Sequence, residues 1–170
     1  MIFRLSQKLA ARIKAGKLSE MPLDANPLAD WSANLFVADR TQYVILSNTP
    51  SLYSCVMLAK GITSAGQFTE RTSECIREFM EKDYHGVVYR RHIAFSIAAG
   101  GFAKTLNRTV TGSMNELIKF AELWLAEADP PNEVGFKLNE SLLSALATET
   151  SGKYGTPNEA FKELVRKSRK

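Results

Sequence analysis

The stretch ANLFVADRTQYVILSN, residues 33–48, constrains the fold more than any other part of the chain. Two runs rich in β-branched, aromatic and aliphatic residues flank a two-residue turn at Asp39 and Arg40. This pattern is typical of a β-hairpin, although Asp-Arg is not the favoured Asn-Gly turn. The run LYSCVMLA, residues 52–59, follows a turn and predicts a third strand. The three strands together predict an antiparallel meander.

The rest of the chain mixes expected helices with further strands. Helical spacing of apolar residues predicts helices over 6–15, 67–82 and 114–128, and Thr156 before Pro157 predicts the cap of a last helix. Alternation predicts a strand or a pair of strands over 86–101, with a short helix in its alanine-rich part as the alternative. Shorter elements are expected as strands over 2–5 and 133–138 and as a helix over 139–149. The sum predicts one α+β domain over residues 1–170, with a largely antiparallel sheet and three to five helices.

Composition is that of a soluble globular protein, with 45% hydrophobic and 24% charged residues in 170. Arg4 interrupts the apolar N-terminus, which excludes a signal peptide, and the longest uncharged apolar run, 93–103, is far shorter than the roughly 20 residues that span a bilayer. Cys55 and Cys75 lack metal-ligand spacing and are interpreted as reduced core residues. We therefore expect a cytoplasmic protein without membrane contact.

Positive charge exceeds negative charge by a modest amount. The formal net charge is +4, and part of the excess lies in a basic C-terminal end, residues 161–170. This balance permits a polyanionic partner such as nucleic acid without requiring one. The basic end is also explained by solvation alone.

The segment KTLNRTVTGSMNE, residues 104–116, is the strongest candidate for a ligand site. Ser113 and Glu116 form an S-x-x-E capping box, which predicts a helix that starts at Ser113. A glycine and free backbone amides at a helix start suit a phosphate, with a basic side chain as countercharge. The candidate phosphate-binding residues are Lys104, Asn107, Arg108, Thr109, Thr111, Ser113 and, from a separate segment, Arg90. The alternative is a loop whose polar side chains only satisfy backbone groups, because no Walker-type spacing is present.

Two histidines are the candidate catalytic residues. On a strand, alternation would place Arg90 and His92 on one face, where His92 would act as a general base or the face would simply be solvated. His85 lies two residues after Asp83 in a pattern that fits an acid–base pair or a helix-ending turn. With only two histidines and no carboxylates at ligand spacing, no metal site is expected, and no cofactor-binding motif occurs.

Several blocks of sequence resemble a family of small bacterial proteins that is classed only as a domain of unknown function. The blocks are FRLSQKLAARIK, NPLADWSANLF followed by YVILSN, REFM, KTLNRTVTGSMNEL, LNESLLSAL and YGTPNEAF. The NR-x-V-x-G-SMN block is the most distinctive of them. The resemblance implies one full-length domain in a bacterial cytoplasm and carries no assigned activity.

Three functions remain open at this point. The first is a binding module that uses residues 104–113, together with Arg90 and the basic C-terminal end, to hold a phosphate-bearing ligand, with nucleic acid as the expected one. The second is an enzyme acting on a phosphodiester or nucleotide, with His92 or His85 as base and Arg108 stabilising negative charge. The third is a protein-interaction partner in a two-protein module, which would use a strand edge or exposed apolar residues of the last helix, such as Phe161 and Leu164.

Overall fold

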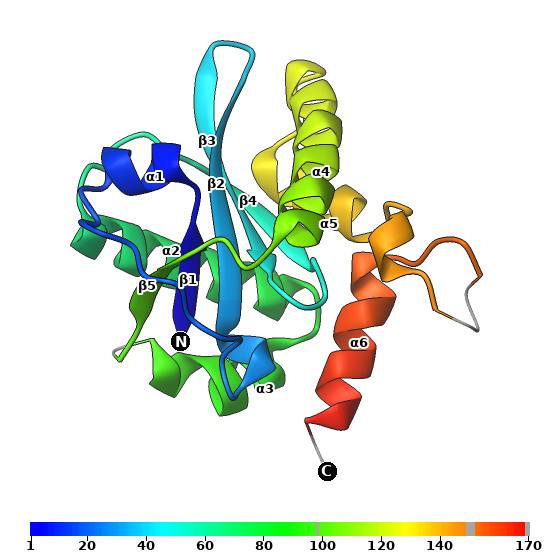
Figure 1. Ribbon diagram of the computed structural model, residues 1–170. Helices are drawn as coiled ribbons and strands as arrows, with labels where there is room; N and C mark the ends of the chain where they lie inside the picture. Colours follow the sequence, from blue (N-terminus) through cyan, green and yellow to red (C-terminus); the bar gives the residue numbers. More distant parts are fainter. Residues whose placement is uncertain (98, 149–151, 169–170) are drawn as a thin grey trace.

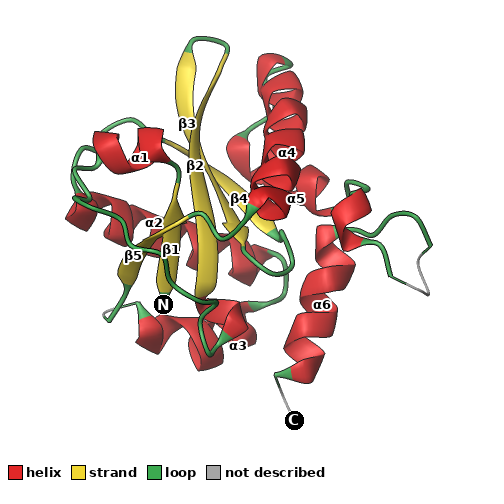
Figure 2. Ribbon diagram, viewed as in Figure 1, coloured by secondary structure: helices red, strands yellow, loops and turns green. Residues whose placement is uncertain are grey.

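A five-stranded mixed sheet runs through the middle of the molecule (Figures 1 and 2). The computed structural model describes residues 1–97, 99–148 and 152–168. The strands are β1 (Ile2–Leu5), β2 (Asp30–Ala38), β3 (Thr41–Asn48), β4 (Ser54–Leu58) and β5 (Gly101–Lys104), in the spatial order β4-β3-β2-β1-β5. β2, β3 and β4 pair antiparallel, whereas β1 lies between β2 and β5 and pairs parallel with both. The antiparallel pairing extends over more residues, so the predicted α+β class with a largely antiparallel sheet is confirmed.

The hairpin of β2 and β3 has the predicted position and turn length. Asp39 and Arg40 have φ angles of 41° and 62°, so both occupy the left-handed region that a type I′ turn requires. Pairing then runs without a bulge from Ala38 opposite Thr41 to Trp31 opposite Asn48. The meander is therefore encoded locally, even without the favoured turn residues.

Helices cover both faces of the sheet. The described residues form α1 (Gln7–Arg12), α2 (Ala65–Lys82), the single turn α3 (Gly86–Val88), α4 (Arg108–Ala126), α5 (Pro131–Asn139) and α6 (Pro157–Lys167). Trp31 and Leu35 point from β2 into a core shared with α1 and α2, and Phe36 points to the opposite face, into a core shared with α4 and α5. No helix in the described ranges is long and apolar enough to cross a membrane.

Side chains cap the starts of α1 and α6, and the cap of α6 is the predicted one. Ser6 precedes α1, and its hydroxyl accepts a hydrogen bond from the Leu9 amide. Thr156 caps α6 by accepting from the Glu159 amide at 3.2 Å, with Pro157 in the first turn as predicted. The apolar residues Phe161 and Val165 of α6 then pack into the core.

The strand predicted over 86–101 is wrong for most of its length. The chain is helical from α3 through a π-helical turn at Tyr89–Ile93 and a 3-10 turn at Ala94–Ser96, and of the described residues in this range only Gly101 belongs to a strand, β5. Gly86, Tyr89 and Ile93 are buried at helical spacing. A short apolar run fits both the two-residue period of a strand and the 3.6-residue period of a helix. Packing on α2 favours the helix here.

The strand predicted over 133–138 is also wrong, because these residues belong to α5. Pro131 stands at the start of this helix, and Val134 and Leu138, one turn apart, are buried against the sheet. Gly135 lies against the ring of Phe79 on α2, where a Cβ atom would approach the ring to 2.6 Å. The predicted helix over 139–149 reduces to a 3-10 turn at Ser144–Leu146, and residue 149 lies outside the described residues.

Candidate anion site between α1 and β5

The helix expected to start at Ser113 starts at Arg108. Asn107 is its N-cap, and the Asn107 Oδ1 atom accepts a hydrogen bond from the Val110 amide at 2.9 Å. Ser113 lies in the second turn and is 5% exposed, so the predicted capping box does not form. Thr109, Val110 and Gly112 are weak helix formers that favour a loop in the sequence, but the asparagine cap and the buried face of α4 extend the helix through them.

The predicted phosphate-binding residues do not form one cluster. Ser113 points into the interior, and the Thr111 hydroxyl donates to the Asn107 carbonyl at 3.0 Å. Arg108 and Thr109 are exposed at the start of α4. Arg90 lies in the π-helical turn, with Nη1 3.8 Å from Oε1 of Glu81. Lys104 is the predicted residue that lines a pocket.

This pocket, here called the α1–β5 pocket, lies between the first helix and the end of the edge strand. It has a volume of about 480 Å³. Its charged residues are Lys14 and Lys104, its polar side chains are Gln7 and Thr105, and none of the carboxylates in the described part of the chain lines it. The remaining lining residues are Leu5, Ala10, Ala11, Gly16 and Leu18. The pocket therefore combines an apolar wall with two cations.

Lys14 is held in place by the way α1 ends. The Ala15 amide donates to the Ala10 carbonyl at 3.0 Å and the Lys14 amide to the Ala11 carbonyl at 3.3 Å, which is the bond pair of a Schellman motif. Lys14 occupies the left-handed position of that motif, with φ of 54°, where glycine is usual. A lysine there costs about 1 kcal/mol in backbone strain. Lys14 is exposed, and it makes no ion pair with any other described residue.

Lys104 reaches the pocket because β5 pairs with β1. Leu5 is the β1 residue opposite Lys104, and the Lys104 amide donates to the Ser19 carbonyl at 2.9 Å. The Lys104 Nζ atom lies 3.2 Å from Oε1 of Glu20, whose side chain is 83% exposed. Such an exposed ion pair is weak, so Lys104 remains available to another anion.

A buried ion pair positions this region, and sequence reasoning missed it. Arg4, on β1, donates from Nε and Nη2 to the two carboxylate oxygens of Asp30 at 2.7 and 2.8 Å, and both side chains are almost fully buried. The guanidinium group also donates to the carbonyls of Met21 and Pro22 at 3.0 and 2.7 Å. Arg4 thus fastens the loop after α1 to the sheet. An arginine inside the apolar run IFRL was the available signal.

The two histidines lie away from this pocket. His85 Nε2 is 3.9 Å from Oδ2 of Asp83, and the His85 ring contacts Tyr53 and Phe161 edge-on at centroid distances of 5.8 and 5.2 Å. The Tyr53 hydroxyl donates to Asp83 Oδ2 at 2.5 Å, and its ring stacks on Phe161. Burial lowers the pKa of His85. This cluster docks α6 on the core, which explains its residues without catalysis.

His92 is half-buried, and its backbone carbonyl accepts a hydrogen bond from Asn26 Nδ2 at 2.6 Å. The helical turn also removes the predicted sheet face that would have joined His92 to Arg90. Within the described residues, no three His, Cys, Asp or Glu side chains gather as a metal site requires.

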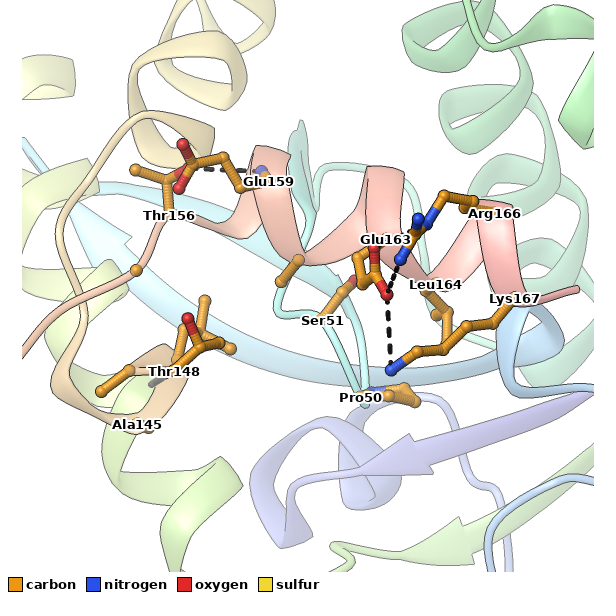
Figure 3. Close-up of a pocket in the computed structure, with 14 residues that line it drawn as sticks. Pro50, Ser51, Ala145, Thr148, Thr156, Glu159, Glu163, Leu164, Arg166 and Lys167 are labelled. Atoms are coloured by element: carbon orange, nitrogen blue, oxygen red, sulfur yellow. Dashed lines mark hydrogen bonds and ion pairs between the residues drawn. The ribbon is translucent and has the colours of Figure 1, made fainter. Parts of the chain in front are cut away.

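A larger pocket, about 830 Å³, lies beside α6 (Figure 3). Its lining combines apolar residues such as Pro50 and Leu164 with the charged residues Glu159, Glu163, Arg166 and Lys167. Arg166 donates two hydrogen bonds of 2.9 Å to Glu163, which lower the pKa of that carboxyl, and Lys167 Nζ lies 3.6 Å from it. The cations of the predicted basic C-terminal end that line this pocket are thus paired, while residues 169 and 170 lie outside the described part.

Comparison with known proteins places the chain in a family. A family model described as a domain of unknown function (DUF6933) matches residues 2–160, which include the whole α1–β5 pocket. No curated protein and no solved structure gives a significant match. The match confirms the resemblance to an uncharacterised family: the chain belongs to the family described as a domain of unknown function, DUF6933.

Proposed function

We propose that this protein is a binding module for a phosphate-bearing ligand, which occupies the α1–β5 pocket. The observation that carries the proposal is the pair of cations, Lys14 and Lys104, in a pocket that no carboxylate of the described residues lines. Two ammonium groups attract a phosphate more strongly than either does alone, and their flexible stems adapt to its oxygens. Lys14 retains its exposed charge at a strained backbone position, a feature that clusters at functional sites.

The pocket favours a small ligand over a polymer. Its volume of about 480 Å³ falls in the range of small-molecule sites. The wall formed by Leu5, Ala10 and Leu18 would cover an apolar part of the ligand, while the lysines hold its phosphate. Among the residues that the structure describes, no aromatic side chain lines the pocket to stack on a nucleobase. The phosphate group, rather than a base, is therefore the expected recognition element.

The other two functions find less support in the geometry. The enzyme hypothesis needs a histidine beside Arg108, yet His85 contacts Tyr53 and Phe161 instead. The interaction hypothesis named a strand edge or exposed apolar residues of the last helix; of the two helix residues, Phe161 is fully buried and Leu164 is partly buried against the core.

The test is a calorimetric titration of the full chain with inorganic pyrophosphate, at about 50 and 200 mM salt. We expect salt-sensitive binding that weakens about five- to tenfold in Lys14→Asn and in Lys104→Gln, since each loses one charge–phosphate contact. Asparagine tolerates the left-handed conformation, so Lys14→Asn removes the charge without disturbing the helix end.

Lys119→Gln is the matched control, because Lys119 is an exposed lysine on α4 outside the pocket lining. Equal affinity in all four proteins would refute the site. A parallel titration with fluorescein-labelled single-stranded RNA separates the ligand classes. If RNA binds strongly and is unaffected by either pocket substitution, the proposed small-ligand function is wrong.

A further inference from the structure

We propose that Cys55 and Cys75 form a reversible redox pair that a hydroperoxide converts to a disulfide. Cys55 lies on β4 and Cys75 on α2, and their Sγ atoms are 3.7 Å apart. This distance is that of two sulfur atoms in van der Waals contact, and both cysteines are free thiols. Formation of a bond of about 2.05 Å therefore requires a shift of less than 2 Å shared between two side chains.

The surroundings of the two thiols define the order of events. Cys75 is partly exposed and lines a surface groove of about 500 Å³ between α2 and the start of α5. Arg71 and Lys82 also line this groove, together with Glu74 and Glu78. Cys55 is 1% exposed and lies behind Cys75. An oxidant in solution thus meets Cys75 first.

Burial also separates the chemical roles of the two sulfurs. Removal from water raises the pKa of Cys55, which keeps this residue a thiol near neutral pH. A buried thiol is shielded from a dissolved oxidant, whereas its contact with the Cys75 sulfur gives it a high effective concentration for attack on a sulfenic acid formed there. Cys75 is accordingly the residue that the oxidant attacks, and Cys55 is the resolving residue.

The two steps balance as follows. In the first, the Cys75 sulfur forms a bond to the distal oxygen of a hydroperoxide, the O–O bond breaks, and the departing oxygen takes the Cys75 thiol proton and leaves as an alcohol or water. Cys75 becomes a sulfenic acid, oxidised by two electrons, while the peroxide is reduced. In the second, the Cys55 sulfur attacks the sulfenic sulfur, the S–O bond breaks, and water leaves with the Cys55 proton and the sulfenic hydroxyl. A dithiol reductant returns the Cys55–Cys75 disulfide to two thiols by thiol–disulfide exchange.

A pair of cysteines that serves only core packing makes the opposite prediction. Such thiols would react independently, Cys75 alone and slowly, and the buried Cys55 would stay reduced. The chain contains only these two cysteines, so a thiol count reports on this pair without interference.

The experiment treats the full chain with a small excess of hydrogen peroxide and counts free thiols in denaturant, with intact mass measured in parallel. We expect both thiols to disappear together in a monomer that has lost two hydrogens, and dithiothreitol to restore both. Oxidation of free glutathione under the same conditions serves as the positive control. If the peroxide oxidises glutathione but both thiols of the protein remain titratable, the proposal is wrong. A product that contains only a sulfinic acid at Cys75 would also overturn it.

Two single variants test the assigned order. In Cys55→Ala, dimedone should trap a sulfenic acid at Cys75, because the resolving thiol is absent. In Cys75→Ser, the one remaining thiol is the buried Cys55. Its oxidation by peroxide should take at least about tenfold longer than the loss of thiols in wild type. Faster oxidation of Cys55 than of Cys75 would contradict the order. The Cys75→Ser result stands even if Cys55→Ala fails to fold.

Discussion

The buried pair of Arg4 and Asp30 allows the sharpest test of how this fold is held together. Asp30→Asn preserves the size of the side chain but removes the charge that faces the guanidinium group. Two charge-assisted hydrogen bonds, of 2.7 and 2.8 Å, lose their ionic acceptor, and the Asp24 amide, 3.0 Å from Oδ2, loses it as well. Arg4 is 1% exposed, so water cannot replace the lost partner.

The expected cost follows from that burial. Removal of one member of a buried ion pair leaves an uncompensated charge and typically costs about 3–5 kcal/mol of unfolding free energy. For a domain of this size, a loss of that order lowers Tm by roughly 10 °C. Replacement of both residues, in Arg4→Met/Asp30→Asn, removes the unpaired charge. The double variant should therefore be more stable than the sum of the two single effects predicts, by about 2 kcal/mol.

Urea unfolding followed by far-UV circular dichroism measures these differences, with the m-value as a check that the unfolded state is unchanged. Glu163→Gln is the control, since it breaks an ion pair at the surface and should leave the midpoint unchanged. The reasoning fails if Asp30→Asn unfolds within about 1 kcal/mol of wild type, or if the single effects simply add.

Three further predictions concern helix ends and pH. Because burial lowers the pKa of His85 in the folded protein, the unfolded chain binds the proton more readily, so stability should fall as pH drops below about 6.5, and His85→Gln should show a smaller fall. Burial and the hydrogen bond to Asp83 raise the pKa of Tyr53, so wild type should lose stability more steeply than Tyr53→Phe as pH rises above about 10 in alkaline melts. Asn107→Ala removes the cap of α4 and should cost about 1 kcal/mol in urea unfolding; no change would mean that the side chain of Asn107 does not cap the helix.

Elements with a strong local pattern were predictable from sequence. The hairpin of β2 and β3, the amphipathic helix α2 and the capped helix α6 lie where pattern, turn length and capping residues place them. In each of these elements, the local conformational preference of the residues and the burial of one face favour the same secondary structure.

Segments whose apolar residues fit both the period of a strand and the period of a helix were not predictable from sequence. Residues 86–97 and 133–138 are short and apolar enough to fit a strand or a helix, and they became helical because each packs on α2 or on the sheet along one helical face. The start of α4 moved from Ser113 to Arg108 for a related reason: a nearby capping pattern was weaker than the asparagine cap and the extended buried face.

By itself, the sequence determined the α+β class and the antiparallel meander, because these depend on contacts between residues near in the chain. Only the tertiary structure brought Lys14 and Lys104 to the lining of one pocket and Cys55 into contact with Cys75. The first pairing depends on the insertion of β1 between β2 and β5, and the second on the docking of α2 against β4. Both pairings result from burial of apolar surface between elements far apart in the chain. Such packing produces no sequence periodicity in the residues that it brings together.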